Sequence, residues 1–503
     1  MKNAVHIDEV TILKEPTLRF AGGHNATDPH DGLTLFGPYG INEPFHPQSP
    51  TYILLGASEG ISLFHKWARM MNKASFMPEN AKHRLWPPFP GFEVAFGSKW
   101  NERPAWTGEI DREKLIMASK KSDQHERTFA VVEMFMNHFE KLRKIDYNVH
   151  VAICVIPEEV WKNCRPKSKI AEPSDEKLAT NLKKRRKAGQ RELWDNFAFD
   201  QYHYAPDFRR QLKARTMQYE IPLQILREST LVEADKDPLT KRRLTTLSDR
   251  MWNLSTALYY KAGGKPWRLN SAREGVCYIG ISYKMGDEKS GSACCAAQMF
   301  LDTGDGIVFL GDDKPIYSPE KKQFTLTSDA SEKLLRGVLE TYKTLDGRPL
   351  KEMFIHCRSE INKSQWAGYE KACPKDVKLV GVRVRPERRG ARLYRVGKRP
   401  VLRGTFWKVS ETSGYLYCSG FKPRIATYDG WETPVPLKID LQYGEAPIEL
   451  VAADILGLTK LNYNACKLGE GEPVTIKFSN AVGEILISNP TVTDHRPNFK
   501  FYI

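Results

Sequence analysis

The sequence predicts an α/β protein with two successive sheets, and two patterns carry this prediction. From residue 51 onward, strand-like apolar runs at 51–56 and 148–156 alternate with amphipathic helices, including one over 126–145. That alternation favours a parallel, Rossmann-like sheet. After Pro266, three strand-like runs precede a helix, a strand, a helix and a strand. With 503 residues, the chain is long enough for more than one hydrophobic core.

Glycine and proline positions divide the chain into three segments. Residues 1–50 are rich in both, so we expect short strands joined by turns, in a segment that packs on the core. The first unit covers 51–265. Its last predicted helix, 250–260, ends near Lys261-Ala-Gly-Gly264 because glycine terminates helices. The second unit covers 266–503.

The second unit has the element order of an RNase H-like fold. Its predicted elements are strands near Tyr278, 294–300 and 306–310, a helix at 330–345, a strand at 353–357, a helix at 364–372 and a strand at 377–384. Short turns between the early strands suit antiparallel hairpins.

Composition indicates a polyanionic partner. The chain has 76 Lys and Arg against 61 Asp and Glu, a net charge of +15, which favours a polyanion through counterion release and steering but does not identify it. No apolar stretch approaches the roughly 20 residues of a membrane span and no signal-peptide core is visible, so we expect a cytoplasmic protein. The nine cysteines include no CxxC pair, which favours reduced thiols over a zinc site.

Two basic stretches are candidate nucleic-acid contacts. The first, 165–191, includes Lys183 to Lys187, and a solvated loop is the favoured interpretation. The second, 383–403, has nine Lys or Arg residues and a single acid. We expect a hairpin whose cations line a groove and follow phosphates, with a solvated face as the alternative. The groove residues are Arg383, Arg385, Arg388, Arg389, Arg392 and Arg395.

A cationic cluster is predicted around a helix over 206–219. Arg209 and Lys213 lie one turn apart on that helix, and Gln224 and Lys261 follow on the next strand and helix. If these groups met at the carboxyl end of the parallel sheet, they would form a phosphate pocket. From periodicity alone, surface cations are the favoured interpretation.

Two strand positions lack the carboxylates that a nuclease of this fold needs. Ser282 and Cys357 stand where the first two metal-binding Asp residues would be. Two-metal phosphoryl chemistry needs several acidic oxygens to hold the cations. We therefore expect no catalytic residues and a chain that holds nucleic acid without cutting it.

Several motifs together resemble Argonaute proteins. The segments Phe208-Arg-Arg-Gln-Leu-Lys213, Ile221-Pro-Leu-Gln224 and Lys261-Ala-Gly-Gly264 are similar to the motif with which the family's MID domain binds a guide 5′ phosphate. Gly37-Pro38, the strand ending in Ser282 and residues 498–503 resemble short prokaryotic Argonautes. The resemblance implies a Rossmann-like MID domain followed by an RNase H-like PIWI domain, without N or PAZ domains.

Carried over residue by residue, the resemblance implies that Lys213, Gln224 and Lys261 bind the guide phosphate. Arg209 stands where many members have a Tyr that stacks on the first guide base. The family's divalent cation, Mg²⁺ or Mn²⁺, would bind Gln224 and a terminal carboxylate on Ile503.

The resemblance also implies partners. They are a guide RNA, a target single-stranded DNA and an APAZ-containing effector in a heterodimer that defends against plasmids or phage. A TIR or sirtuin-like NAD hydrolase is the favoured effector, with a nuclease as the alternative. Two other functions stay open: an active guide-dependent nuclease with displaced catalytic residues, and an RNA-binding scaffold that needs no guide.

Overall fold

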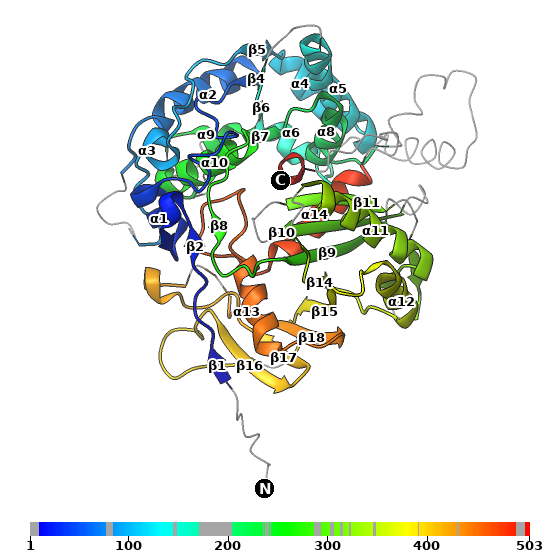
Figure 1. Ribbon diagram of the computed structural model, residues 1–503. Coiled ribbons are helices and arrows are strands. Elements are labelled where there is room, and N and C mark those ends of the chain that lie inside the picture. The colour runs from blue at the N-terminus through cyan, green and yellow to red at the C-terminus, as the bar shows by residue number, and fades with distance from the viewer. Residues whose placement is uncertain are drawn as a thin grey trace, which may run out of the picture.

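The computed structural model describes residues 10–76, 84–143, 148–170, 204–234, 236, 241, 243–285, 293–301, 306–311, 315–320, 323–345, 349–390, 392–428, 430, 432–488 and 498–503. The basic run from Lys183 to Lys187 lies outside the described residues. The fold is α/β, as predicted, with one sheet above the other and the C-terminal end between them (Figure 1).

The upper sheet is parallel throughout. Its strand order is β5 (Trp106–Glu109), β4 (Tyr52–Gly56), β6 (Val151–Ile156) and β7 (Leu223–Arg227). All residues of β4 and β6 are buried. A parallel strand covered on both faces is apolar along its whole length, which explains why these segments read as continuous apolar runs.

Helices cover both faces of this sheet. Residues of α2 (Ser58–Met71) and α10 (Leu247–Lys261) share a buried cluster with Leu54 and Ile153. Residues of α5 (Gln124–Leu142) and α8 (Phe208–Thr216) share another with Ile53 and Ala152. Shorter helices complete the unit: α3 (Phe92–Phe96), α4 (Arg112–Ser119), α6 (Glu158–Asn163), η3 (Met217–Tyr219) and α9 (Glu228–Leu231).

The lower sheet has nine strands in the order β1-β16-β17-β18-β15-β14-β9-β10-β11. These are β1 (Val10–Ile12), β16 (Thr405–Ser410), β17 (Ser413–Leu416), β18 (Leu437–Tyr443), β15 (Lys378–Pro386), β14 (Glu352–Cys357), β9 (Val276–Met285), β10 (Ala293–Leu301) and β11 (Gly306–Gly311). The first three strands of the predicted order, β9 to β11, pair antiparallel, and β14 pairs parallel with both β9 and β15. A small hairpin, β12 (Ile316–Ser318) with β13 (Gln323–Thr325), lies apart from the sheet.

Helices also sandwich the lower sheet. On one face, α11 (Ser328–Leu345) and α12 (Lys363–Ala372) pack over Ile279 and Ile355. On the other lie α13 (Ile448–Leu458) and α14 (Val474–Leu486). The contact with α14 requires a glycine, because a Cβ on Gly280 would lie 2.0 Å from the backbone oxygen of Thr475.

The N-terminal segment packs on both units. Its strands β2 (Leu18–Arg19) and β3 (Asn25–Ala26) form a small sheet with β8 (Arg268–Leu269). The expectation of strands and turns alone was wrong, since the segment also contains η1 (Ala21–Gly23) and α1 (Pro29–Phe36). A local signal explains α1: Asp28 accepts a hydrogen bond from the backbone of His30, and proline occupies the first turn.

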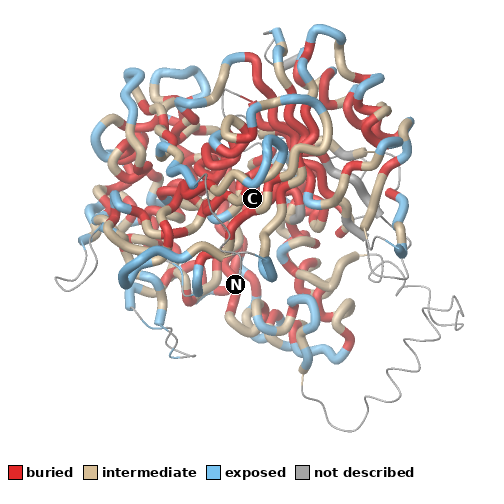
Figure 2. The backbone as a smooth tube through the Cα atoms, turned by 90° about the horizontal axis from the view of Figure 1, so that it is seen from below, coloured by how far each residue is buried: buried red, intermediate tan, exposed pale blue. Residues whose placement is uncertain are grey.

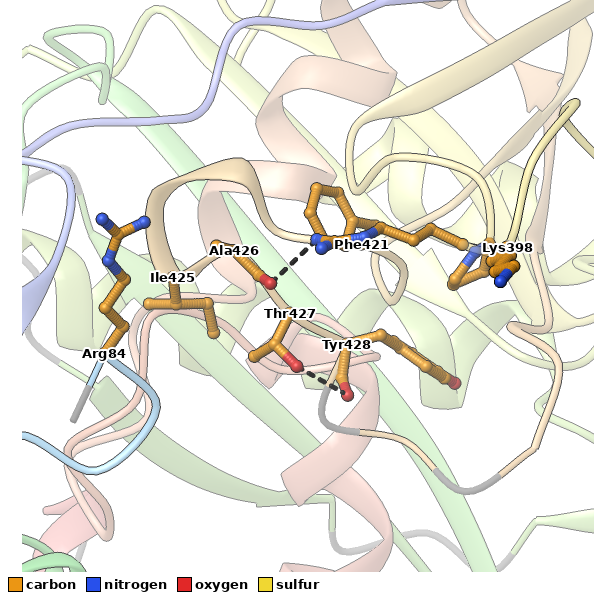
Figure 3. A pocket seen from close by; sticks show the side chains of 9 residues that line it. Arg84, Lys398, Phe421, Ile425, Ala426, Thr427 and Tyr428 are labelled. Atoms are coloured by element: carbon orange, nitrogen blue, oxygen red, sulfur yellow. Dashed lines mark hydrogen bonds between the residues drawn. The ribbon is translucent and has the colours of Figure 1, made fainter. Parts of the chain in front are cut away.

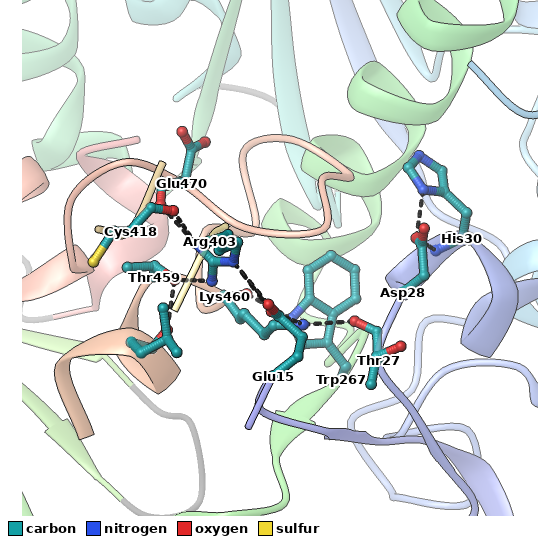
Figure 4. Close-up of polar contacts among 11 residues, drawn as sticks. Glu15, Thr27, Asp28, His30, Trp267, Arg403, Cys418, Thr459, Lys460 and Glu470 are labelled. Atoms are coloured by element: carbon teal, nitrogen blue, oxygen red, sulfur yellow. Dashed lines mark hydrogen bonds and ion pairs between the residues drawn. The ribbon is translucent and has the colours of Figure 1, made fainter. Parts of the chain in front are cut away.

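A buried polar cluster fastens this segment to the lower unit (Figure 4). The Glu15 carboxylate lies 3.0 Å from Arg403 Nε and 2.8 Å from Lys460 Nζ. Lys460 also donates to the backbone oxygen of Thr27 at 2.6 Å, and Arg403 Nη2 donates to Thr459 at 2.6 Å. The side chains of both cations are almost completely buried. Such charges are stable inside a protein only while paired and hydrogen-bonded.

One buried apolar cluster runs through both units. It joins Leu54 of the upper sheet, Leu18 of the N-terminal segment and Ile439 of the lower sheet. Figure 2 shows buried residues throughout the interior and exposed residues mainly in peripheral loops and turns. Within the described part of the chain, no helix is long and apolar enough to cross a bilayer.

Candidate functional site

The predicted cations and amide come from three elements of the upper unit. Arg209 and Lys213 lie on α8, which begins where Asp207 caps the backbone of Arg210 at 3.0 Å. Gln224 is the second residue of β7, and Lys261 is the last residue of α10. The ammonium-bearing residues are buried, with Lys213 3% and Lys261 1% exposed.

Hydrogen bonds connect these side chains to one another and to the lower unit. Lys261 Nζ donates to Gln224 Oε1 at 2.6 Å and lies 3.5 Å from Asn464 Oδ1. Lys213 Nζ donates to the main-chain oxygen of Ile503, the residue expected to carry the terminal carboxylate. Asn464 and Ile503 belong to the C-terminal part of the chain, so both units contribute to the cluster.

The electrostatics of the cluster are unfavourable without an anion. Burial, and after it the charge of Arg209, lowers the pKa of Lys261 to about 7. Burial and then the charges of Arg209 and Lys261 lower the pKa of Lys213 well below its ordinary range. Other cations of α8 have acidic partners: Arg210 lies 2.7 Å from Glu484. Among the described residues, no Asp or Glu contributes to the pKa of either lysine.

The cluster does not lie wholly where the sequence placed it. Gln224 is near the amino end of β7, so its expected position at the carboxyl edge was wrong. Arg209 instead lines a cavity of about 140 Å³ beside Ile156, the last residue of β6, together with Trp161.

The oxygens expected to bind a divalent cation face ammonium groups instead. Gln224 Oε1 accepts a hydrogen bond from Lys261, and the Ile503 backbone oxygen accepts one from Lys213. Binding of Mg²⁺ or Mn²⁺ by these two oxygens would require both hydrogen bonds to be displaced. Within the described ranges, no group of three or more His, Cys, Asp or Glu residues could hold a metal ion.

Ser282 and Cys357 lie on neighbouring strands but on opposite faces of the lower sheet. Ser282 Oγ donates to the backbone oxygen of Ser479 on α14 at 2.6 Å. Cys357 belongs to the cluster under α11 and α12, and its Sγ lies 3.0 Å from Ser359 Oγ. Because side chains alternate along a strand, the structure does not bring these two positions together.

Comparisons with known proteins place this geometry in a wider context. No protein-family model matches the chain. An argonaute protein of Aquifex aeolicus (strain VF5) is 22% identical over 245 residues, which are 47% of this chain and 31% of that protein. Clostridium butyricum Argonaute, solved with a guide DNA and a 19-mer target DNA, superposes with a TM-score of 0.61 at 15% identity. The match covers 98% of this chain and 55% of that one.

The chain has an Argonaute-like fold. Two further solved structures agree: Aa-Ago with externally bound siRNA at a TM-score of 0.56, and A. aeolicus Argonaute at 0.53, each at 15% identity. They are matched over 98% and 97% of this chain but over 56% and 55% of their own lengths. The chain therefore spans little more than half of these Argonautes. The two α/β units correspond in fold to the MID and PIWI lobes.

In this Argonaute-like fold, the arginines predicted to line a groove do not lie on a hairpin. The prediction of a hairpin over 383–403 was wrong, because β15 already pairs with β14 on one side and with β18 on the other. The described residues between β15 and β16 contain no strand. The six arginines thus lie at the end of β15 and on the loop that follows.

Several of these arginines already have partners within the protein. Arg383 Nε donates to the backbone oxygen of Arg358 at 3.2 Å, and Arg392 Nη2 donates to that of Arg388 at 2.7 Å. The Arg385 guanidinium lies 3.8 Å from the Glu387 carboxylate. The remaining groove residues, Arg388, Arg389 and Arg395, are exposed.

Two residues of the candidate site were missed in the sequence analysis. Asn464 contacts Lys261, which is 203 positions away in the sequence, and no local sequence pattern predicts a contact over such a separation. Trp161 lies beside Arg209 in the cavity, with Arg165 and Arg227 each 5.2 Å from its ring centroid. The position of Trp161 shortly after a buried strand could have indicated a role at the carboxyl end of the sheet, but α6, which carries it, had not been predicted.

Proposed function

We propose that the chain binds the 5′-phosphorylated end of a guide, an RNA, and pairs that guide with single-stranded DNA without cutting it. The observation that carries the proposal is the pair of buried lysines, Lys213 and Lys261, to whose pKa values no described Asp or Glu contributes. A phosphate between them would offset the burial and the repulsion that now lower both pKa values. Arg209 would add a third positive charge.

The neighbouring cavity supports a guide end in preference to a free anion. Arg209 lines the cavity together with Trp161, and its positive charge also lowers the pKa of Lys213. The cavity therefore lies next to the lysine cluster. A phosphate on the lysines would place the adjoining nucleotide near an aromatic ring and a planar guanidinium, and both groups stack on bases. The solved relatives with guide DNA or siRNA make nucleic acid the natural ligand class for the fold.

The proposal that the chain does not slice rests on residue chemistry. Neither Ser282 nor Cys357 supplies a carboxylate, and because their side chains face opposite sides of the sheet they do not form a pair of converging ligand positions. Two-metal cleavage requires acidic ligands converging from one side. The alternative, a nuclease with displaced catalytic residues, predicts metal-dependent cleavage opposite the guide.

We also propose that enzymatic activity belongs to a partner with an APAZ region, so that guide and target binding switch on an effector against plasmids or phage. A TIR or sirtuin-like NAD hydrolase is favoured over a nuclease. Support for this part comes from the sequence resemblance to short Argonautes and from the non-acidic Ser282 and Cys357. Target binding would activate the effector only if the target binds the active state of the complex more tightly than the inactive state.

The guide-end proposal is tested with matched oligonucleotides that carry a 5′ phosphate or a 5′ hydroxyl. Lys213→Ala and Lys261→Ala should each weaken the phosphorylated guide about tenfold to a hundredfold, because each removes a charge-assisted contact. The 5′-hydroxyl guide should change little. Lys66→Ala, at an exposed lysine of α2, is the matched control. Equal losses for both guides would make the lysines general electrostatic contacts, as expected for an RNA scaffold that needs no guide.

The non-slicing proposal is tested with the guide-loaded protein, a complementary single-stranded DNA and either Mg²⁺ or Mn²⁺. We expect an intact target, and a discrete cut opposite the guide would contradict the proposal. Repeating the guide titration with EDTA tests whether a divalent cation contributes at the 5′ end. Co-expression with the neighbouring genes, followed by assays of NAD consumption and DNA degradation with and without target, tests the effector.

A further inference from the structure

A second basic pocket lies in the lower unit, apart from the lysine cluster and with no residue in common with it (Figure 3). Its volume is about 770 Å³, within the range of roughly 300 to 1,000 Å³ typical of small-ligand sites. One wall is the segment before β16, with Lys398 and Arg399. The other follows β17 and contains η4 (Pro423–Ile425), and Arg84 reaches the rim from the upper unit.

The charge of this pocket is of one sign. Arg84, Lys398 and Arg399 line it, and its nine described lining residues include no Asp or Glu. Figure 3 shows Arg84 and Lys398 on opposite sides of the pocket, with the 421–428 segment between them. All three cations are exposed. A phosphate entering the pocket would therefore meet positive charge from two sides and displace only solvent.

The pocket also presents flat, pre-positioned stacking surfaces. The Arg399 guanidinium carbon lies 4.4 Å from the centroid of the Phe421 ring, and its Nη1 donates to the backbone oxygen of Ala426 at 2.9 Å. Tyr428 is held by a 2.7 Å hydrogen bond from its hydroxyl to the backbone oxygen of Glu432. A planar guanidinium fixed on an aromatic ring offers its other face to a base, and a fixed phenol offers a second surface.

The backbone turn that carries these surfaces is itself closed. Lys422 N donates to the Thr427 carbonyl at 2.9 Å, and Ala426 adopts a left-handed conformation with φ 52°. Arg424 points out of the turn and pairs with Asp31 of α1. The stacking surfaces therefore need little ordering when a ligand binds, which favours affinity.

We infer that this pocket binds one nucleotide of a single-stranded nucleic acid. The base lies against Tyr428 and the stacked Arg399–Phe421 pair, while Lys398 and Arg84 meet the phosphates. Arg395, whose guanidinium carbon is 5.3 Å from the Phe421 centroid, extends the positive charge toward the arginine loop after β15. The inference does not depend on the lysine cluster, since a strand without a 5′ phosphate satisfies it.

The probe is a 12-residue oligodeoxythymidine with a 5′ hydroxyl and one 4-thiothymidine, titrated against the full chain and then photo-crosslinked. Tyr428→Ala and Arg399→Ala should each weaken binding about tenfold, the effect of losing one stacked base. Arg424→Ala is the matched control, because it removes an arginine of the same turn that does not line the pocket. Crosslinks should map to peptides containing Phe421 or Tyr428.

Two results would overturn the inference. Unchanged oligonucleotide binding in both pocket variants, with crosslinks elsewhere, would remove the site. If adenosine 5′-monophosphate competed as strongly as unlabelled oligonucleotide, the pocket would be a site for a free nucleotide, and the inference that it binds part of a strand would be refuted. Thermal melting of each variant separates a lost contact from a lost fold. The Lys213→Ala and Lys261→Ala variants should bind this probe normally, which distinguishes failure here from failure at the guide end.

Discussion

Replacing Lys261 by Met should remove a pH dependence of stability that the wild-type protein carries. In the folded protein the pKa of Lys261 is lowered from 10.5 to about 7 by burial and by Arg209. In the unfolded chain the group keeps its ordinary pKa. Between those two values the unfolded state binds more protons than the folded state, so the free energy of unfolding rises with pH.

The size of the effect follows from the pKa difference. From about pH 6 to about pH 9, proton linkage gives a gain of about 2 to 3 kcal/mol in the free energy of unfolding from this group alone. Lys213 adds a change of the same sign, because its pKa is lowered as well. In Lys261→Met the first contribution disappears. The second shrinks, because Lys213 loses a repelling neighbour.

The slope with pH is more diagnostic than the stability at any one pH. Methionine has a similar shape but leaves Gln224 Oε1 without the donor it now has, which costs about 1 to 3 kcal/mol. That cost is the same at every pH. Urea unfolding of ligand-free wild type and variant at a series of pH values measures both quantities. Parallel stability curves for the two proteins would show that Lys261 keeps an ordinary pKa and would refute the reasoning.

The remaining predictions concern packing and guide binding. Glu15→Gln should lower the free energy of unfolding by about 3 to 5 kcal/mol, because it leaves the buried charge of Arg403 short of its partner; Arg424→Ala, at an exposed ion pair, should change it by less than about 1 kcal/mol. Gly280→Ala should shift the urea midpoint strongly by pushing α14 off the sheet, whereas Gly471→Ala, with only an ordinary contact at 3.9 Å, should not. Affinity for a 5′-phosphorylated guide should fall as pH rises above about 7, since Lys261 loses its proton; a flat profile would contradict this.

Much of the fold could be predicted from the sequence, because it depends on local patterns of apolar residues. The apolar runs at 51–56 and 148–156 became β4 and β6, since parallel strands covered on both faces are apolar throughout. The predicted helix at 330–345 became α11. The failures were α1, whose capping by Asp28 was overlooked, and the hairpin over 383–403, whose partners were strands distant in sequence.

The sequence by itself determined the residue types of the candidate site: two lysines, an arginine and a glutamine in one order, and no carboxylate at positions 282 and 357. Only the tertiary structure decided that Lys213 and Lys261 are buried, that Asn464 contacts one of them, and that Ser282 and Cys357 face apart. The physical reason is that side-chain charge is a property of the residue, whereas desolvation and proximity depend on contacts between segments that are from 37 to 290 positions apart in the sequence. A lysine pattern is compatible with a solvated surface until packing removes the water, and that removal makes a bound anion favourable.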